Sequence, residues 1–509
     1  MLKRMLVILV AIAVLAPILG EAGAPKPGGT LKYGLLRDPV GWEPHVNQGW
    51  TTYTFMNSIY ETLIRYSLKG DLEPGLAVRW EIPNPTTYIL HLRNGVKFHS
   101  GNPLTAEDVK FSIARIQDPK TAATRTREFS VVHEVTVVDP NTVKITLKNP
   151  DALFLELLAS GEAVIVDKKW AEAGGNFKQQ CSGTGPFKQG PFETGVRYAL
   201  VKNLDYWEKP YPYLDRIELA TIAKDEVRVQ ALQTGSVDMI EYVPWQSIPT
   251  LEKDPGVKVY VGYDTFNVIR LNTKRPPFDN PKVRQAFNYL IDRKEIIDLA
   301  WGGIGQPMAA ALIPEGHWAY PDLHVWKYDP TKGKQLLAEA GVNPATTKIV
   351  FDSTTLTVHM DSAQIIVTQL QKAGFNQIEL KPMDVPTQQK KRASGDYQMF
   401  MDGTGLPWPD PDFYTSFFGS DGGSYAKAVG FSDAKLDQLL EEGRTTLDQG
   451  KRKAIYAQVE QRIVDLAPWV WINWRPQAEA AGAHVHGFFQ FPGALAGKSL
   501  MNLKYVWKE

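Results

Sequence analysis

Residues 76–113 read LAVRWEIPNPTTYILHLRNGVKFHSGNPLTAEDVKFSI, and this stretch has an ordered local pattern. Apolar residues at every second position predict a strand over 88–92. The glycines and the proline between 95 and 103 suit turns that stop the strand. Thr105, followed three residues later by Asp108, is close to a capping box and predicts a helix that begins there. We expect this segment to hold a small subdomain together, with no direct part in binding a ligand.

The blocks that carry this pattern also resemble a known family. Trp80, the sequence LRxGVKFHxGxPLTAxDV and the aromatic Phe111 are similar to the extracytoplasmic solute-binding proteins of the peptide/nickel uptake family, which is family 5 of the ABC-transporter class and includes dipeptide- and oligopeptide-binding proteins. Further similar blocks are NLDYW (203–207), the run 268–297 and WPDPDFYTSFF (408–418). The resemblance therefore covers essentially the whole mature chain.

The resemblance implies an α/β fold of the periplasmic-binding-protein-like type II class. Two lobes would surround a central cleft, and the first lobe would contain an extra strand-rich subdomain. The expected boundaries are 1–24 for a signal peptide; 25–57, 183–271 and 478–509 for the core of lobe I; 58–182 for the extra subdomain; and 272–477 for lobe II.

The N-terminus has the pattern of a secretory signal peptide. Lys3 and Arg4 precede an apolar run over 5–19 that is short for a membrane span, and small residues follow it. The only cysteine, Cys181, lies far from this region, so neither a disulfide within the chain nor a lipid-anchored cysteine after the signal is expected. We expect a periplasmic protein.

Composition narrows the classes of partner. Lys plus Arg and Asp plus Glu both number 56, so the net charge of zero gives no reason to expect a nucleic-acid partner. The hydrophobic content of 43% and charged content of 22% are those of a soluble globular protein. The 14 Trp and 20 Tyr residues suit a ligand cleft, because such rings often line one. We expect a monomer.

No catalytic or metal-binding motif is present. The sequence has no GxSxG, HExxH, CxxC or Walker pattern. His484 and His486 form an isolated HxH pair, and Asp410 and Asp412 are paired acids beside prolines, a common turn composition. We expect no catalytic residue, no metal and no cofactor.

Two positions depart from the peptide-binding relatives. In those relatives the segment before the DPD block carries an acid for the ligand's α-ammonium, and Pro407 occupies that position in this sequence. Some relatives place an arginine for the peptide carboxylate within the segment that corresponds to 349–362, and this sequence has none there. The pair of charges that would hold a peptide by both ends is therefore missing.

Other residues are candidates for contact with the ligand. Arg270 stands on the strand over 263–272, which lines the cleft in relatives; it either pairs with a nearby acid or reaches an anionic or polyhydroxylated ligand. Trp408 is held between two prolines and offers a stacking face and one donor. The polar and aromatic cluster after the first strand comprises Trp42, His45, Asn47 and Trp50. The full set of expected ligand-binding residues is Trp408, Arg270, Tyr263, Trp245, Asn47, His45 and Asp410.

The function that follows is solute capture for an ABC importer. The protein would enclose a peptide, a peptide-like compound or another small polar solute by hinge closure and deliver it to a permease served by ATPase subunits. An oligosaccharide, an opine-like anion or a metal chelate remains an alternative ligand. A chemosensory receptor and a secreted hydrolase remain alternative classes.

Overall fold

The computed structural model describes residues 24–39, 41–46, 50–308, 310–323, 325–491, 493, 495 and 502–509. The expected signal peptide lies almost wholly outside these residues, and so does Asn47. No helix in the described ranges is long and apolar enough to cross a membrane.

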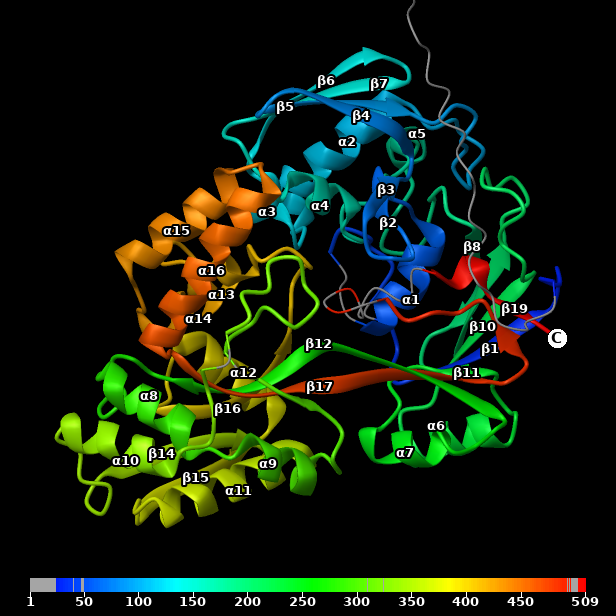
Figure 1. The fold of residues 1–509 in the computed structure, drawn as a ribbon. Helices are drawn as coiled ribbons and strands as arrows, with labels where there is room; N and C mark the ends of the chain where they lie inside the picture. Colours follow the sequence, from blue (N-terminus) through cyan, green and yellow to red (C-terminus); the bar gives the residue numbers. More distant parts are fainter. Residues whose placement is uncertain are drawn as a thin grey trace, which may run out of the picture.

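One mixed sheet of eleven strands runs through the described part of the molecule (Figure 1). Its strands are β1 (Thr30–Leu35), β8 (Phe187–Glu193), β9 (Arg197–Lys202), β10 (Arg216–Thr221), β11 (Met239–Ile240), β12 (Val257–Leu271), β13 (Gln306–Pro307), β14 (Lys348–Thr354), β15 (Gln377–Met383), β16 (Met399–Gly405) and β17 (Trp469–Gly482). The order is β15-β14-β16-β12-β17-β11-β1-β10-β9-β8, and β13 pairs with β17 outside this path. The long antiparallel strands β12 and β17 thus join the two halves of the sheet.

A smaller antiparallel sheet forms the top of the molecule in Figure 1. Its order is β4-β5-β7-β6, and α2 packs against it. Tyr88, Leu90 and Leu92 are buried at alternate positions, as the sequence predicts. The elements of this part are β2 (Ile64–Tyr66), β3 (Leu72–Pro74), β4 (Ala77–Asn84), β5 (Thr87–Leu92), α2 (Ala106–Gln117), η1 (Pro119–Thr121), α3 (Thr126–Phe129), β6 (Val132–Asp139), β7 (Thr142–Leu147), α4 (Phe154–Ala159) and α5 (Lys168–Glu172). We call residues 58–182 the subdomain.

The helices beside the β14-β16 half of the main sheet form two layers. One buried core lies against α8 (Pro281–Leu290), α9 (Arg293–Ala300), α10 (Pro330–Glu339) and α11 (Thr357–Lys372). A second core lies on the other face, against α13 (Phe413–Phe418), α14 (Ser424–Val429), α15 (Ala434–Thr445) and α16 (Gln449–Leu466), and it continues into the subdomain. The remaining elements are α1 (Trp50–Ile59), α6 (Asp225–Gln233), η2 (Trp245–Ser247), α7 (Ile248–Leu251), α12 (Val385–Ser394), β18 (Val485–His486) and β19 (Trp507–Lys508).

Several expected elements are confirmed. The capping residue predicted for α2 is in place, because the carboxylate of Asp108 accepts a hydrogen bond of 2.8 Å from the backbone N–H of Thr105. The hairpin β6-β7 turns at the predicted Asp-Pro-Asn sequence. Helix α16 ends at Leu466, before Pro468, and β17 follows at once.

In sequence, Ile59, Leu63 and Tyr66 have helical spacing and predict a helix over 57–66, and this prediction is wrong. Helix α1 ends at Ile59, and the chain then enters β2. The end of α1 is met by the glycine-rich segment, where the N–H of Gly185 donates to the Ile59 carbonyl at 2.8 Å. A Cβ atom on Gly183 would lie 2.1 Å from that carbonyl oxygen, so only glycine permits the approach. This contact comes from residues far along the chain, and local periodicity does not reveal it.

Candidate functional site

The ladder between β12 and β17 is interrupted where the two halves of the sheet meet. Gly262 pairs with Gln477 and Thr265 pairs with Arg475, so Tyr263 and Asp264 face the single residue Pro476. A bulge of this kind bends a strand, and proline has no N–H to give to a ladder. The place where β12 and β17 cross between the two halves of the sheet, which we call the crossing, therefore lacks regular ladder hydrogen bonds at residues 263, 264 and 476.

Polar residues gather on one face of the sheet beside this bulge. Thr265 pairs with Arg475, and Asn267 pairs with Asn473 and Gly403. Residues paired in an antiparallel ladder project from the same face. The next position on that face, Ile269, is buried in the core beneath α8, α9 and α11. The polar residues therefore form the end of this core nearest the bulge, and we call this set the crossing cluster.

Several atoms of the crossing cluster have no hydrogen-bond partner. Within the described part of the chain, they are Arg475 Nε, Thr265 Oγ1 and Asn267 Oδ1, all of them buried, and Gln477 Oε1 on the other side of the bulge is likewise buried without a partner. Among the described residues, the Asn267 side chain makes one hydrogen bond, in which its Nδ2 donates to Asn473 Oδ1 at 3.1 Å. Buried polar atoms are nearly always paired in folded proteins, so water or the polar groups of a ligand are suited to pair with this group of atoms.

His359, in the first turn of α11, lies beside this cluster. A Cβ atom on Gly403 would be 2.8 Å from Asn267 Oδ1 and 3.1 Å from His359 Nε2, so the glycine leaves room between the two side chains. The other ring nitrogen, Nδ1, is 2.8 Å from Thr354 Oγ1. Burial, and next the charge of Arg475, lowers the pKa of His359 to about 4, so the imidazole is neutral at pH 7.

Arg270 is on the opposite face of β12. Its Nε donates to Asp402 Oδ2 at 2.6 Å, and its guanidinium carbon lies 4.6 Å from the centroid of the Trp469 ring. Its side chain is only 3% exposed. The structure thus places Arg270 in the ion pair that the first of the two sequence interpretations describes.

Trp408 lies at the boundary between the subdomain and lobe II. Arg125 of the subdomain places its guanidinium carbon 5.3 Å from the Trp408 ring centroid and donates to the Pro407 carbonyl at 3.4 Å. The indole Nε1 is buried and has no hydrogen-bond partner among the described residues. Trp408 also lines a cavity of about 660 Å³ between the subdomain and helices α13 and α15, a volume in the range of ligand pockets.

Asp410 forms a buried two-pronged ion pair with Arg452 of α16. Both N–O distances are 2.7 Å, and each side chain is 6% exposed. Asp412 is buried nearby, and its burial raises its pKa to about 7. Asp410 thus links the WPDPD segment to α16, and Asp412 links it to α15 through Arg444 at 3.4 Å.

The remaining candidates are dispersed. His45 is buried within lobe I, where its Nε2 lies 3.0 Å from the Val164 carbonyl oxygen, and burial lowers its pKa to about 4. Trp245 packs on Trp301 with ring centroids 5.7 Å apart. Trp42 packs against Phe55 in the core of lobe I. Only Tyr263, in the bulge, lies on the strand segment that carries the crossing cluster.

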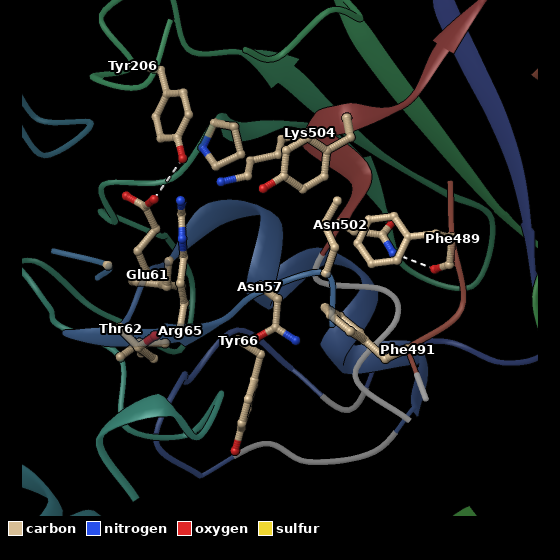
Figure 2. Close-up of a pocket in the computed structure, with 16 residues that line it drawn as sticks. Asn57, Glu61, Thr62, Arg65, Tyr66, Tyr206, Phe489, Phe491, Asn502 and Lys504 are labelled. Atoms are coloured by element: carbon tan, nitrogen blue, oxygen red, sulfur yellow. Dashed lines mark hydrogen bonds between the residues drawn. The ribbon is translucent and has the colours of Figure 1, made fainter. Parts of the chain in front are cut away.

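A second, much smaller cavity lies in lobe I beside the C-terminal segment (Figure 2). Its volume is about 60 Å³, well below that of a ligand pocket. Arg65 and Lys504 of its lining pair with Glu208 at 2.8 Å and 2.5 Å, and Glu61 accepts a hydrogen bond of 2.8 Å from the hydroxyl of Tyr206. This arrangement ties the C-terminal segment to β2.

The two histidines of the HxH pair have separate partners. His484 Nε2 lies 2.9 Å from Asp238, and the ring of His486 stacks on Trp507 with centroids 4.3 Å apart. Across the described ranges, no group of three or more His, Cys, Asp or Glu side chains is placed to hold a metal ion.

Arg475 and His359 were absent from the residues expected from sequence. One feature of the sequence could have indicated Arg475. The dipeptide Arg-Pro interrupts the run WVWINWRPQAEAAG, which is otherwise buried, and an arginine in a central strand needs a partner for its charge. The sequence does not show whether Arg270 or Arg475 has a partner. That depends on the faces and register of β12 and β17, which only the folded structure shows.

Comparisons with known proteins agree with this architecture. A sequence profile described as "Bacterial extracellular solute-binding proteins, family 5 Middle" matches residues 71–426. "Heme-binding protein A" of Haemophilus influenzae is 30% identical over 500 residues, covering 91% of this chain and 90% of its own. "Glutathione-binding protein GsiB" of Escherichia coli K12 is 26% identical over 446 residues, covering 86% and 87%.

Solved structures show the same similarity. The PBP AgaA of A. tumefaciens R10, in complex with agropinic acid, is 32% identical, with a TM-score of 0.82 over 94% of this chain and 99% of its own. The periplasmic binding protein DppA from Helicobacter pylori, in complex with the peptide STSA, is 26% identical, with a TM-score of 0.81 over 95% and 99%.

Proposed function

Since the chain belongs to the bacterial extracellular solute-binding proteins of family 5, and so is a solute-binding component of an ABC importer, we propose that it encloses a small polar solute at the β12–β17 crossing. The observation that carries this proposal is the crossing cluster, in which several buried donors and acceptors lack partners within the described chain. A solute bound there would satisfy atoms that otherwise cost stability.

The bulge opposite Pro476 supports a hinge at the same place. The few residues of an interrupted ladder can absorb a change in backbone angles, whereas the paired segments on either side stay rigid. Contacts with both lobes would then make the closed form the bound form, which a permease recognises.

The compartment and partners follow from the family and the N-terminus. The protein would be exported by its signal peptide, act in the periplasm as a monomer, and deliver the solute to a permease with two ATPase subunits. The relatives are named for heme and glutathione or were solved with agropinic acid and a peptide, so we expect the solute to be a small compound of this range.

Capture of the solute tests this function. The full mature chain is incubated with a metabolite extract, desalted without denaturation, and the retained compounds are identified by mass spectrometry. We expect one polar compound to be retained unchanged and to raise the unfolding temperature, since a ligand at 100 times its Kd adds about 2.7 kcal/mol. Conversion of the compound by the purified protein would contradict a transport role.

A further inference from the structure

We propose that Arg475 receives a carboxylate of the transported solute, together with the uncapped first turn of α11. This inference rests on the proposed function and names the chemical class of its ligand. It assigns the ligand's anionic group to a residue outside the set expected from sequence.

The first step of the argument is that Arg475 is unlike the other arginines of the β12–β17 region. Arg270 is paired with Asp402, and Arg452 is paired with Asp410. Arg475 is half-buried, its Nε is fully buried, and within the described residues its side chain takes part in no hydrogen bond or ion pair. A partly desolvated cation without a partner lowers stability, so its presence calls for an anion supplied from outside the chain.

The second step concerns the end of α11 that lies beside the crossing cluster. No side chain caps the first turn of this 16-residue helix, and that turn contains no acid. Nε2 of His359, within that turn, lies beside Gly403, which pairs with Asn267 of the crossing cluster, and the charge of Arg475 adds to the effect of burial in lowering the His359 pKa. The free N–H groups and positive end of a helix favour an anion.

The third step is topological. Helix α11 follows the carboxyl end of β14, and the parallel strand β16 ends at Gly405, which pairs with Thr265. In open α/β sheets, ligands bind outside the carboxyl ends of the parallel strands. Arg475 reaches this same edge from the antiparallel strand β17, because its register places it opposite Thr265.

The charges present favour a monoanion. One guanidinium is available, and His359 is neutral at pH 7. Asp402 is engaged by Arg270 and Arg392, and a buried acid, Asp264, lies in the bulge next to Thr265, so the site has no surplus of positive charge for a second negative charge. The guanidinium fork matches a carboxylate with two parallel hydrogen bonds. A phosphate dianion would leave one charge uncompensated in a half-buried site. Thr265 Oγ1 and Asn267 Oδ1 can then bind hydroxyl or amino groups of the same solute.

The test uses three acids: agropinic acid, glutathione and the dipeptide Met-Leu. Each acid is compared with its amide, in which every carboxylate is replaced by a carboxamide. Isothermal calorimetry measures their binding to the wild type, Arg475→Gln and Arg475→Lys. Arg275→Gln is the matched control, because this exposed arginine of lobe II pairs only with exposed Asp396. Inorganic phosphate is the fourth probe.

We expect at least one acid to bind the wild type and the control with equal affinity. The amide of that acid should bind both proteins at least tenfold more weakly. Arg475→Gln should lose affinity for the acid by tenfold or more and bind the acid and the amide alike, and Arg475→Lys should fall between. The unfolding temperature of ligand-free Arg475→Gln should equal or exceed that of the wild type, because no native partner is lost. A lower temperature would indicate a structural role.

Three results would overturn the inference. They are equal binding of the acid by Arg475→Gln and the wild type, no loss on amidation, or binding of phosphate at least as tight as that of the acids. Failure of all three acids to bind the wild type also removes the carboxylate assignment. That failure is distinguishable from failure of the proposed function, because capture from the extract measures solute binding with no assumption about charge.

Discussion

Asp410 was expected from the sequence to contact the ligand, but in the structure it forms a buried ion pair with Arg452. Asp410 lies in a WPDPD turn, and the chain returns to it only 42 residues later, when α16 presents Arg452. Removing one member of a buried pair leaves the other charged and desolvated. The local structure around this turn therefore depends on both residues.

We predict that Asp410→Asn lowers the free energy of unfolding by about 3 kcal/mol, the size expected when a buried pair loses one partner. Urea unfolding followed by tryptophan fluorescence measures the change, with exposed Asp421→Asn as the control. Solute affinity at the crossing cluster should stay within twofold of the wild type. A stable Asp410→Asn variant that has lost its solute would show instead that Asp410 contacts the ligand.

At the scale of elements, glycine decides where α1 ends. The segment with Gly183 and Gly185 passes so close to the last turn of α1 that Gly185 takes over the Ile59 carbonyl. The helix stops because its terminal carbonyl is bonded by another element, which satisfies a group that a helix end leaves open.

Gly183→Ala should therefore destabilise the protein by about 1 to 3 kcal/mol, since overpacking forces the backbone apart. The control is Gly450→Ala, at the start of α16, where the nearest atom to an added Cβ is Asp448 Oδ1 at 3.4 Å. That control should be neutral or stabilising, because alanine has the higher helix propensity. Differential scanning calorimetry of both variants gives the comparison, and equal melting temperatures would refute the packing argument.

At the scale of the whole molecule, the subdomain and lobe II share a polar boundary. Asp151 pairs with Arg444 of α15 at 2.9 Å, and the Ala152 N–H donates to the Arg444 carbonyl at 2.8 Å. Glu156 of α4 accepts a hydrogen bond of 2.5 Å from Tyr66. Burial raises the pKa of Glu156 to about 7, and Asp410 across the boundary adds to the rise while Arg452 opposes it.

This pKa predicts the direction of a pH effect. An unfolded glutamate loses its proton near pH 4.5, whereas folded Glu156 keeps it to about pH 7. The folded state then holds more protons between these values, so the contribution of Glu156 to stability falls as pH rises from about 4.5 to 7 and stays low above that. In Glu156→Gln the side chain does not titrate, so this decrease in stability with rising pH does not occur.

Relative to the wild type, Glu156→Gln should therefore gain stability on going from pH 5 to pH 8, by an amount on the order of 2 to 3 kcal/mol, because one pKa unit corresponds to about 1.4 kcal/mol. Melting temperatures of both proteins at the two pH values give the difference. Exposed Glu107→Gln, whose partner Lys168 lies within the subdomain, is the control and should show no such gain. A difference independent of pH would place Glu156 ionised in the folded protein.

The sequence by itself determined the family, the α/β class and many of the elements. Segments such as 88–92, 142–147 and 330–339 have local periodicity and caps that tertiary contacts reinforce. It also predicted that this chain lacks the pair of charges used by peptide-binding relatives. Local patterns survive folding because each is consistent with the core it faces.

Only the tertiary structure decided which arginine is available. In sequence, Arg270 and Arg475 are both single cations on apolar strands. In the folded chain, Arg270 faces Asp402, whereas Arg475 lies beside a bulge, opposite Thr265 and near the uncapped end of α11. The physical reason is that successive residues of a strand point to opposite faces of the sheet. Arg270 therefore lies on the face that carries Asp402, whereas the register of β17 places Arg475 on the other face, opposite Thr265.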